Sequence, residues 1–360
     1  MRRFARMGTR DDFGRQNVTQ DFEIREYRQG DEIGILDLFN RVFAENNPSF
    51  TPRSLAFWRW QFESNPLGHH TFVATSTADR RIVGTYTAIP GTWLHDDGAF
   101  VGSQAVDTCV DAEYRRVLKR EGLFLSLARA WFDHFGRPER DRIVYGFPNP
   151  IAFRIGTRQL DYRPVHVPVV RMVRDFDAAW IDYLGGMGAD AMAVEEVDQL
   201  PPDLDAAFRA MVDALGDEHL VQRRDAAYLN WRYRTCPTIR YRFITVRSMP
   251  DAKLQGVVVM RVKWFDKAIA PLVDWIVDGA DQSAIAALAQ AAARAAAVGG
   301  VTRLETWVPP WSAHRATLAK IGFAPDPSTF NLCIRVFGPR FDEHWAKEHW
   351  FFTMGDSDIY

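Results

Sequence analysis

Segments rich in Val, Thr and aromatic residues follow one another in the first half of the chain and again in the second half. Turn residues separate these segments, and this combination is typical of β-strands. We therefore predict two sets of strands, at residues 71–76, 81–90 and 100–110 in the first half and at 241–247, 254–265 and 269–277 in the second.

Apolar residues change to a helical period after the last strand of each set. Residues 122–135 place their apolar side chains on one helical face. The alanine-rich stretch at 284–298 favours a helix through its intrinsic propensity. A short strand that runs into prolines follows in each half, at 142–147 and at 303–308. We expect a further helix and a final strand to close each unit.

The two halves also share an aromatic and basic cluster that lies before the strands. The clusters are Phe57-Trp58-Arg59-Trp60 and Asn230-Trp231-Arg232-Tyr233, and a proline follows each of them. The clusters and the elements after them keep the same order through both halves, which indicates a tandem repeat. The predicted fold class is α/β, with two mixed sheets flanked by helices.

The repeat divides the chain into five parts. We expect a mobile N-terminal arm, a first domain, a linker rich in Gly, a second domain and a C-terminal tail, at residues 1–20, 21–176, 177–202, 203–340 and 341–360, respectively. The tail carries Trp350, Phe351 and Phe352, and a dispensable end would seldom hold three such residues. We therefore expect the tail to pack onto the body, near the active site.

The composition bounds the class of protein. Of the 360 residues, 47% are hydrophobic and 25% charged, as in globular proteins, and the formal net charge of -2 gives no indication of a nucleic-acid partner. Three scattered cysteines without CxxC spacing argue against disulfides and a zinc site. No apolar stretch has the length of a membrane span or the place of a secretory signal. We expect a cytoplasmic protein without a metal or a membrane anchor, and its oligomeric state stays open.

The junction after the strand at 100–110 carries the most informative pattern. The strand ends near Val110, a basic loop with Lys119 and Arg120 follows, and a helix starts near Gly122. Unpaired N–H groups and the positive end of the helix dipole make such a junction suitable for a pyrophosphate. Solvated basic loops at strand-to-helix junctions are also common, so the pattern alone does not identify a ligand.

Residues 106–124 resemble the acyl-CoA pyrophosphate loop of the GNAT acyltransferase superfamily. The segments 24–43 and 145–152 are similar to the first strand and helix and to the fifth strand of that fold. The resemblance extends over residues 22–337 as a tandem pair of GNAT-like folds, and it implies acetyl-CoA or another acyl-CoA as co-substrate. Two departures concern the loop, because Phe124 replaces a small residue and a few extra residues lengthen it.

The resemblance implies that the first half binds the cofactor. Its cofactor site would consist of Val110, Lys119, Arg120, Gly122, Leu123 and Phe124. Asn149 would reach the thiol end of the cofactor, although Asn in this place is also a good helix cap. In the second half the corresponding loop at 273–281 is acidic and has no Arg or Lys. We expect that copy to be degenerate for CoA.

Acyl transfer from a thioester to an amine requires a group that takes the amine proton. Many family members have a tyrosine proton donor where this chain has Gly156, so the usual donor is missing. Asp107 is a candidate base, although the equivalent Asp274 in the second half favours a structural role for both. Asp356 and Asp358 become candidates if the tail packs near the site, and a solvated acidic end is the alternative.

These features together predict an acyl-CoA-dependent N-acyltransferase. Its acceptor would be a small-molecule amine such as an amino sugar or a natural-product amine, and its donor acetyl-CoA or another acyl-CoA. Two other functions stay open. An aminoacyl-tRNA-dependent peptidoglycan transferase also pairs two such folds, but it should lack the pyrophosphate loop and show a basic face. A non-catalytic acyl-CoA-binding protein would explain the missing tyrosine and the altered loop.

Overall fold

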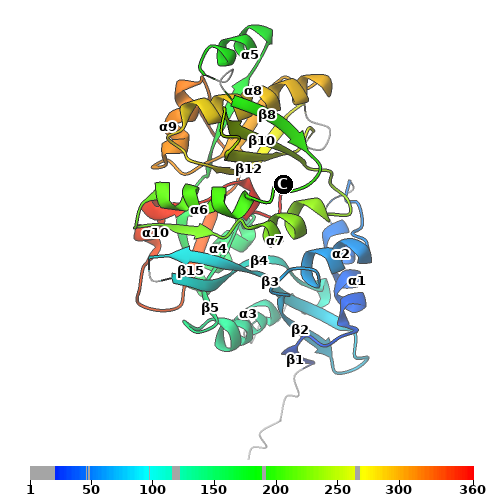
Figure 1. Ribbon diagram of the computed structural model, residues 1–360. Coiled ribbons are helices and arrows are strands. Elements are labelled where there is room, and N and C mark those ends of the chain that lie inside the picture. The colour runs from blue at the N-terminus through cyan, green and yellow to red at the C-terminus, as the bar shows by residue number, and fades with distance from the viewer. Residues whose placement is uncertain are drawn as a thin grey trace, which may run out of the picture.

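Two twisted sheets lie one above the other in the computed structural model, with the end of the chain between them (Figure 1). The structure describes residues 21–45, 47, 49–96, 98–115, 122–188, 192–263 and 268–360. The mixed α/β architecture predicted from the sequence is therefore confirmed. The N-terminal arm expected at 1–20 lies outside the described residues.

The first sheet is built around a long hairpin of β3 and β4. Neighbouring strands are antiparallel except for two parallel pairs, β4 with β5 and β9 with β16, and the short strands β9 and β16 extend the sheet beside β3. In spatial order its strands are β1 (Phe22–Glu26), β2 (His70–Ser76), β3 (Ile82–His95), β4 (Gly98–Val110), β5 (Asp141–Gly146), β15 (Leu332–Val336) and β6 (Arg163–His166), with β9 (Leu220–Gln222) and β16 (Trp350–Phe351) attached.

The second sheet repeats this pattern around the hairpin of β11 and β12. Its only parallel pair among the described strands is β12 and β13, which corresponds to β4 and β5 in the first sheet. In spatial order its strands are β14 (Ala324–Pro327), β7 (Val170–Asp175), β13 (Arg303–Trp307), β12 (Ala270–Val277), β11 (Leu254–Met260), β10 (Arg242–Ser248) and β8 (Met192–Val197).

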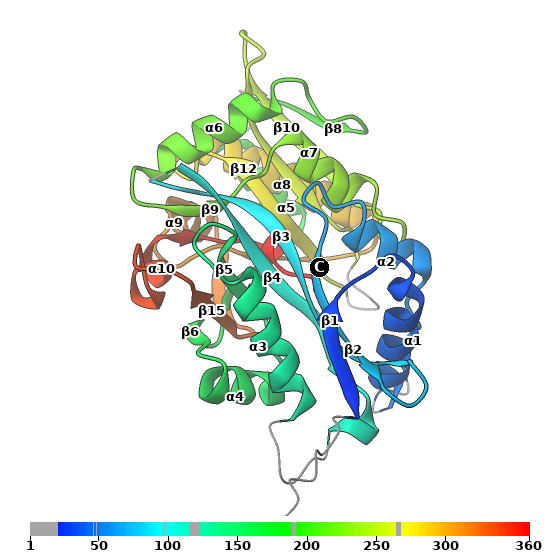
Figure 2. The same ribbon diagram turned by 90° about the horizontal axis from the view of Figure 1, so that it is seen from below.

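Helices cover both faces of the first sheet (Figure 2). On β2, Val73 packs with α1 and α2, whereas its neighbours Phe72 and Ala74 pack under α3 on the opposite face, as the strand alternation requires. None of the helices in the described part of the chain combines the length and apolarity needed to cross a membrane. The helices are α1 (Asp31–Ala44), α2 (Leu55–Phe62), α3 (Leu123–Phe135), α4 (Pro150–Gln159), α5 (Ala178–Gly185), α6 (Leu204–Leu215), α7 (Ala226–Leu229), α8 (Gln282–Val298), α9 (Ala313–Lys320) and α10 (Glu343–His349).

The two halves exchange strands, which differs from the expectation that each unit closes with its own strand. β7 belongs to the first half in sequence but pairs with β13 and β14 in the second sheet. β15 belongs to the second half but lies between β5 and β6 in the first sheet. Arg171 of β7 pairs with Glu305 at 3.1 Å and with Asp326 at 2.7 Å, so buried and half-buried charges favour this arrangement.

The stretch 177–202, expected as a linker, is folded into the second lobe. It contains α5 and β8, and β8 pairs antiparallel with β10 at the edge of the second sheet. Trp180 of α5 donates a hydrogen bond to the carbonyl of Ile321, which fixes α5 next to α9. The glycines and prolines of this stretch therefore lie at the ends of helices and strands and do not mark a flexible connection.

A single apolar cluster joins the facing sides of the two sheets. It includes Trp93 and Tyr145 of the first sheet, Val257 of the second, and Trp350 and Phe351 of the C-terminal segment. The C-terminal segment therefore forms part of the core between the lobes.

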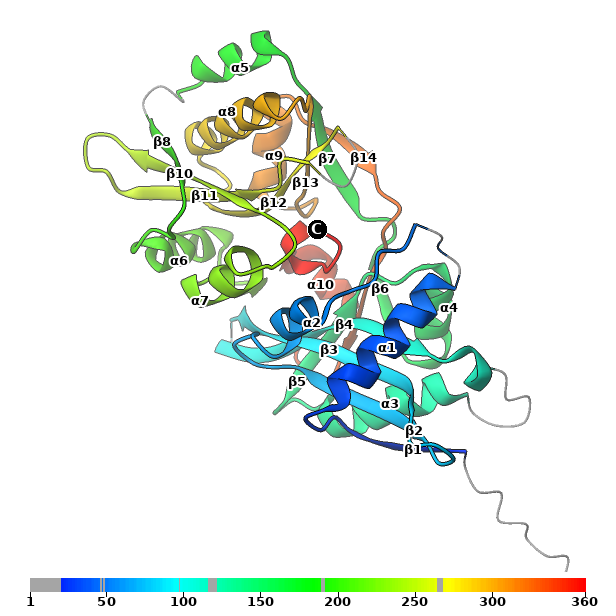
Figure 3. The ribbon, with the colours of Figure 1, turned by 90° about the vertical axis from the view of Figure 1, so that its right-hand side faces the viewer.

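The two aromatic clusters of the repeat meet at this interface. The Trp60 indole donates to the carbonyl of Trp231 at 2.7 Å, and the Trp231 indole donates to the carbonyl of Trp60 at 2.8 Å. The two rings stack with their centroids 6.2 Å apart. Figure 3 shows the corresponding helices, α2 and α7, beside the C-terminal segment.

A buried arginine connects the second sheet to the C-terminal segment. Arg224 has no solvent-exposed surface, and its guanidinium donates to Asp274 and to Asp356, each at 2.6 Å. It also donates to the Thr353 hydroxyl at 3.1 Å, and Tyr233 donates to Asp274 at 2.9 Å. The charges are thus paired and hydrogen-bonded, which a buried ion group requires.

We predict that Arg224→Met lowers the free energy of unfolding by about 3–5 kcal/mol, because it leaves two buried carboxylates without a partner. Arg80→Met makes the same chemical change in an exposed pair with Glu23 and should change the free energy of unfolding little, because solvent screens such a pair. Urea denaturation of the wild type and both variants measures the change in the free energy of unfolding. Equal losses in the two variants would contradict the role of Arg224.

The strand exchange predicts that residues 21–176 do not fold alone. Without β15, β5 and β6 each lack a neighbour, and β7 has no sheet to join. We expect the isolated fragment to give a poorly dispersed amide NMR spectrum, and co-expression with residues 177–360 to restore dispersion. A well-dispersed spectrum of the fragment by itself would show that the exchange is dispensable.

Candidate active site

The parallel strands β4 and β5 separate halfway along β4, near the end of β5. Their ladder runs from Val101 and Asp141 to Gln104 and Tyr145 and ends there. Beyond this point β5 leads through Pro148 into α4, and a cavity with about 900 Å³ of free space, its opening included, lies between the diverging elements. Unpaired strand edges at such a divergence leave backbone groups available to a ligand.

A β-bulge in β4 turns Asp107 toward this cavity. Between the pairs Thr85–Cys109 and Thr87–Val106, β4 contains one more residue than β3, and Asp107 has a φ of 53°. A left-handed conformation costs a residue other than glycine on the order of 1 kcal/mol. The surrounding pairs hold Asp107 in place despite this strain.

Arg53 forms an ion pair with Asp107. Its backbone is fixed by Asn40 of α1, because the Arg53 N–H donates to the Asn40 side chain at 2.8 Å and Asn40 donates back at 3.1 Å. Its guanidinium lies 4.1 Å from the centre of the Phe39 ring. Burial raises the pKa of Asp107, Arg53 opposes the increase, and the charge of Asp358 adds to it.

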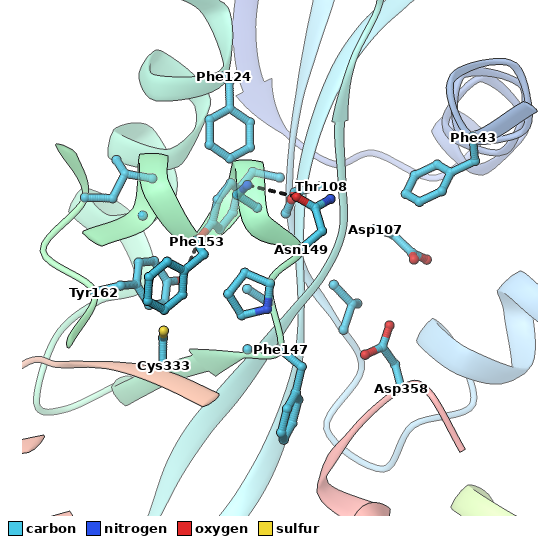
Figure 4. Close-up of a pocket in the computed structure, with 18 residues that line it drawn as sticks. Phe43, Asp107, Thr108, Phe124, Phe147, Asn149, Phe153, Tyr162, Cys333 and Asp358 are labelled. Atoms are coloured by element: carbon cyan, nitrogen blue, oxygen red, sulfur yellow. Dashed lines mark hydrogen bonds between the residues drawn. The ribbon is translucent and has the colours of Figure 1, made fainter. Parts of the chain in front are cut away.

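Asp358 of the C-terminal segment lies at the same end of the cavity as Asp107 (Figure 4). Gln104, the last residue of β4 that pairs with β5, donates to one Asp358 oxygen at 2.8 Å. Asp358 is exposed to solvent, and it lines the cavity. The loss of hydration raises its pKa, and the positive charges of Arg53 and Arg232 act in the opposite direction.

Asp356 lies outside this cavity, in the network of Arg224. Its carboxylate accepts from Arg224 and from the backbone N–H of Thr353 at 2.7 Å, and it is 1% exposed. Burial raises the pKa of Asp356 to about 6, with Arg224 opposing and Asp274 reinforcing the shift. The two tail aspartates proposed from the sequence thus have different environments, and Asp358 is the one that lines the cavity.

The expected pyrophosphate site lies at the start of α3. Gly122 precedes the helix without a side-chain cap, and a Cβ atom there would meet nothing within 4 Å. Phe124 lines the cavity, whereas Leu123 and Val110 are buried in the core and offer only backbone groups (Figure 4). Lys119 and Arg120 lie outside the described residues.

Asn149 lines the cavity and caps α4 at the same time. Its side-chain oxygen accepts from the N–H groups of Ile151 at 3.0 Å and Ala152 at 2.9 Å. The capping interpretation of Asn149 therefore describes its contacts in this structure, and contact with a ligand would involve its remaining amide group.

Several cavity residues were not among the sequence predictions. Tyr162 and Tyr86 share a hydrogen bond of 2.7 Å between their hydroxyl groups inside the cavity wall, and burial raises the pKa of both. Cys333 arrives on the exchanged strand β15. Arg53 and Gln104 carry no motif that distinguishes them from other strand and loop residues. Only the three-dimensional arrangement identifies them.

The corresponding junction of the second sheet is filled by side chains of α9. His314 is buried and contacts the carbonyl of Val277 at 2.9 Å, and Thr317 donates to the carbonyl of Gly279 at 2.7 Å. A Cβ atom on Gly279 would overlap His314. The gap that forms the cavity in the first half is therefore occupied by protein in the second.

A second cavity begins at Asp358, with about 530 Å³ of free space, its opening included. Among the residues that the structure describes, Asp358 alone lines both cavities. The walls of the second cavity come from α2 and from the region around α7, so both lobes contribute to it.

Comparisons with known proteins agree with this architecture. Residues 23–164 match the model of the family described as acetyltransferase (GNAT) domain. A search of curated protein sequences gives no significant match.

Solved structures match the tandem arrangement over most of the chain, at low sequence identity. A GCN5-related N-acetyltransferase from Anabaena variabilis is 12% identical with a TM-score of 0.61, over 88% of this chain and 72% of that one. Saccharomyces cerevisiae N-myristoyltransferase with bound myristoyl-CoA is 14% identical with a TM-score of 0.54, over 89% and 83%. A tandem GNAT protein from the clavulanic acid biosynthesis pathway is 14% identical with a TM-score of 0.52, over 89% and 100%.

The matched domain contains the separated strands, the bulge and the start of α3. The second lobe falls within the 88–89% of the chain that these solved structures cover, one of which is described as a tandem GNAT protein. Residues 23–164 therefore form an acetyltransferase (GNAT) domain, and the whole chain has a fold of two tandem units of this type.

Proposed function

We propose that the protein transfers the acyl group of an acyl-CoA, with acetyl-CoA the first donor to test, to a small-molecule amine. The observation that carries this proposal is Asp358, because its carboxylate lines both the cavity between β4 and β5 and the second cavity. A donor bound in one cavity and an acceptor bound in the other would meet at this carboxylate.

The first half supplies the features that an acyl-CoA requires. The uncapped N-terminus of α3 offers N–H groups and a positive dipole end to a pyrophosphate. The unpaired part of β4 and the residues from Gly146 to Asn149 offer a slot for the extended pantetheine arm. The known neighbours that bind myristoyl-CoA share this fold, which supports the choice of donor.

The closed junction of the second half supports a single donor site. His314 and Thr317 occupy the gap that a second pantetheine would need. Together with its acidic loop at 273–281, this indicates that the second lobe shapes the acceptor side.

Asp358 is the better of the two cavity carboxylates for taking the amine proton. Asp107 is engaged by Arg53, whereas Asp358 accepts one hydrogen bond from the neutral Gln104 on Oδ1, and its Oδ2 is the remaining proton acceptor. A carboxylate with a raised pKa is a stronger base, and the nearby guanidinium groups of Arg53 and Arg232 disfavour the ammonium form of the amine.

The proposed reaction balances without further reactants. The amine nitrogen forms a bond to the thioester carbon while its proton passes to Asp358. The C–S bond then breaks, and the CoA thiolate leaves and is protonated by water in the open cavity. The proton on Asp358 returns to solvent before the next turnover.

We predict that Asp358→Asn lowers kcat by about 10²–10⁴-fold, because the amide has no basic oxygen to take the proton. In the wild type, activity should fall as the pH decreases through the raised pKa of Asp358, so the acidic limb lies above the ordinary range of an aspartate. This limb should vanish in the variant. A pH–rate profile that keeps the same limb in Asp358→Asn would assign it to another group.

We predict that Gly122→Asp weakens acetyl-CoA binding by at least about tenfold, because a carboxylate would stand beside the pyrophosphate. Gly122→Ala is the matched control, since a Cβ atom at this position meets nothing within 4 Å. Calorimetric titration of both variants separates charge from bulk. Equal affinities for the wild type and Gly122→Asp would remove the start of α3 from the donor site, and no binding to the wild type would contradict acetyl-CoA as donor.

A further inference from the structure

The walls of the second cavity are mainly aromatic. Six aromatic side chains line it, three from the two aromatic clusters of the repeat and one each from α7, strand β5 and the C-terminal segment: Phe57, Trp60, Trp231, Tyr228, Tyr145 and Tyr360. Such a lining suits a small molecule with a flat apolar body.

The polar atoms of these aromatic walls already have partners. The indoles of Trp60 and Trp231 donate to each other's backbone carbonyls. The Tyr145 hydroxyl donates to the carbonyl of Asp356 at 3.0 Å, and the Tyr228 hydroxyl to that of Gly355 at 3.3 Å. These four residues therefore offer a ligand their ring faces and edges rather than hydrogen bonds.

Two glutamines that line the same cavity differ from these aromatic residues, because their side-chain oxygens have no hydrogen-bond partner. Gln61 is 4% exposed and Gln222 is 7% exposed, and the side-chain oxygen of each is buried without a hydrogen-bond partner. An unpartnered buried amide oxygen is destabilising, so each of these two oxygens would gain from a hydrogen-bond donor. Rotation about the last side-chain bond exchanges the oxygen and nitrogen of each amide, so each glutamine can present either a donor or an acceptor to the cavity.

The charged groups of the cavity favour a ligand with one amino group. Asp358 stands where the two cavities meet and can pair with one amino group. Arg232 also lines the second cavity, and it is fixed by hydrogen bonds to the carbonyls of Ser357 at 2.8 Å and Tyr360 at 3.0 Å. Its positive charge disfavours a second ammonium group, which argues against polyamines.

We infer that the second cavity binds the acceptor, and that this acceptor is a compact aromatic amine that carries a hydroxyl group. The ring packs against the aromatic wall that Trp60, Tyr228 and Trp231 form, the amine reaches Asp358, and the hydroxyl pairs with Gln61 or Gln222. An amino sugar fits less well, because most of its hydroxyl groups would face aromatic walls without partners. This inference rests on the proposed function, since it names the acceptor for that reaction.

The first test compares three amines as acceptors for acetyl-CoA, with CoA thiol release as the signal. Tyramine has an aromatic ring and a hydroxyl, phenethylamine lacks only the hydroxyl, and glucosamine has several hydroxyls and no aromatic ring. We expect kcat/KM for tyramine to exceed both others by at least about tenfold, because a site built for a hydroxyl rejects the analogue without it. A preference for glucosamine, or equal values for tyramine and phenethylamine, would overturn the inference and leave the acyltransferase function intact.

The second test removes the glutamines. Gln61→Leu and Gln222→Leu should reduce the preference for tyramine over phenethylamine to about twofold or less. Neither should lower the melting temperature as much as Gln290→Leu, because Gln290 donates to the carbonyl of Ile181 in the second lobe and its hydrogen bond is lost. Gln290→Leu should keep the preference, which makes it the matched control. An unchanged preference in both cavity variants would overturn the inference.

A direct binding measurement keeps the inference separate from the proposed reaction. If no amine is acetylated, calorimetric titration of the protein with tyramine alone decides the matter. Binding that is weakened in Gln61→Leu or Gln222→Leu but not in Gln290→Leu supports the cavity as an aromatic amine site without the reaction. Absence of tyramine binding to the wild type would overturn the site as well.

Discussion

The position of the candidate site depends on the buried ionic group around Arg224. Its guanidinium holds Asp274 of the second sheet and Asp356 of the C-terminal segment in one place, without access to water. Asp358 lies two residues further along the same segment and projects into both cavities. The cost of removing three charges from water is offset only when the pairing geometry is accurate. The geometry of this ionic group therefore also determines the position of the Asp358 carboxylate.

The two copies of the fold illustrate how one architecture is used in two ways. In the first copy the strands separate after Gln104 and the space between them stays open. In the second copy the equivalent space is filled by His314 and Thr317, which satisfy backbone carbonyls that a ligand would otherwise meet. One copy can then serve as a rigid wall for the other, and a shared cavity forms where the lobes meet.

The sequence was sufficient for the fold and for part of the site. Strand composition and the alanine-rich helix identified two mixed sheets, and the junction near Gly122 was visible as a strand, loop and helix. The strand exchange was not predictable, because β7 and β15 have ordinary strand sequences and their partners are chosen by long-range contacts. The different environments of Asp356 and Asp358 also depend on packing, since the two residues are alike in sequence context. Arg53, Gln61 and Gln104 have no local signature of any kind.

The exchange of β7 and β15 has a consequence for the order in which the protein is made. During translation the edge of β5 has no neighbour until β15 has left the ribosome, after nearly the whole second lobe. At synthesis rates of about 5–20 residues per second, that edge stays exposed for on the order of ten seconds or more. An open strand edge is a template for wrong pairing, so the nascent chain needs protection by a chaperone or by slow local folding.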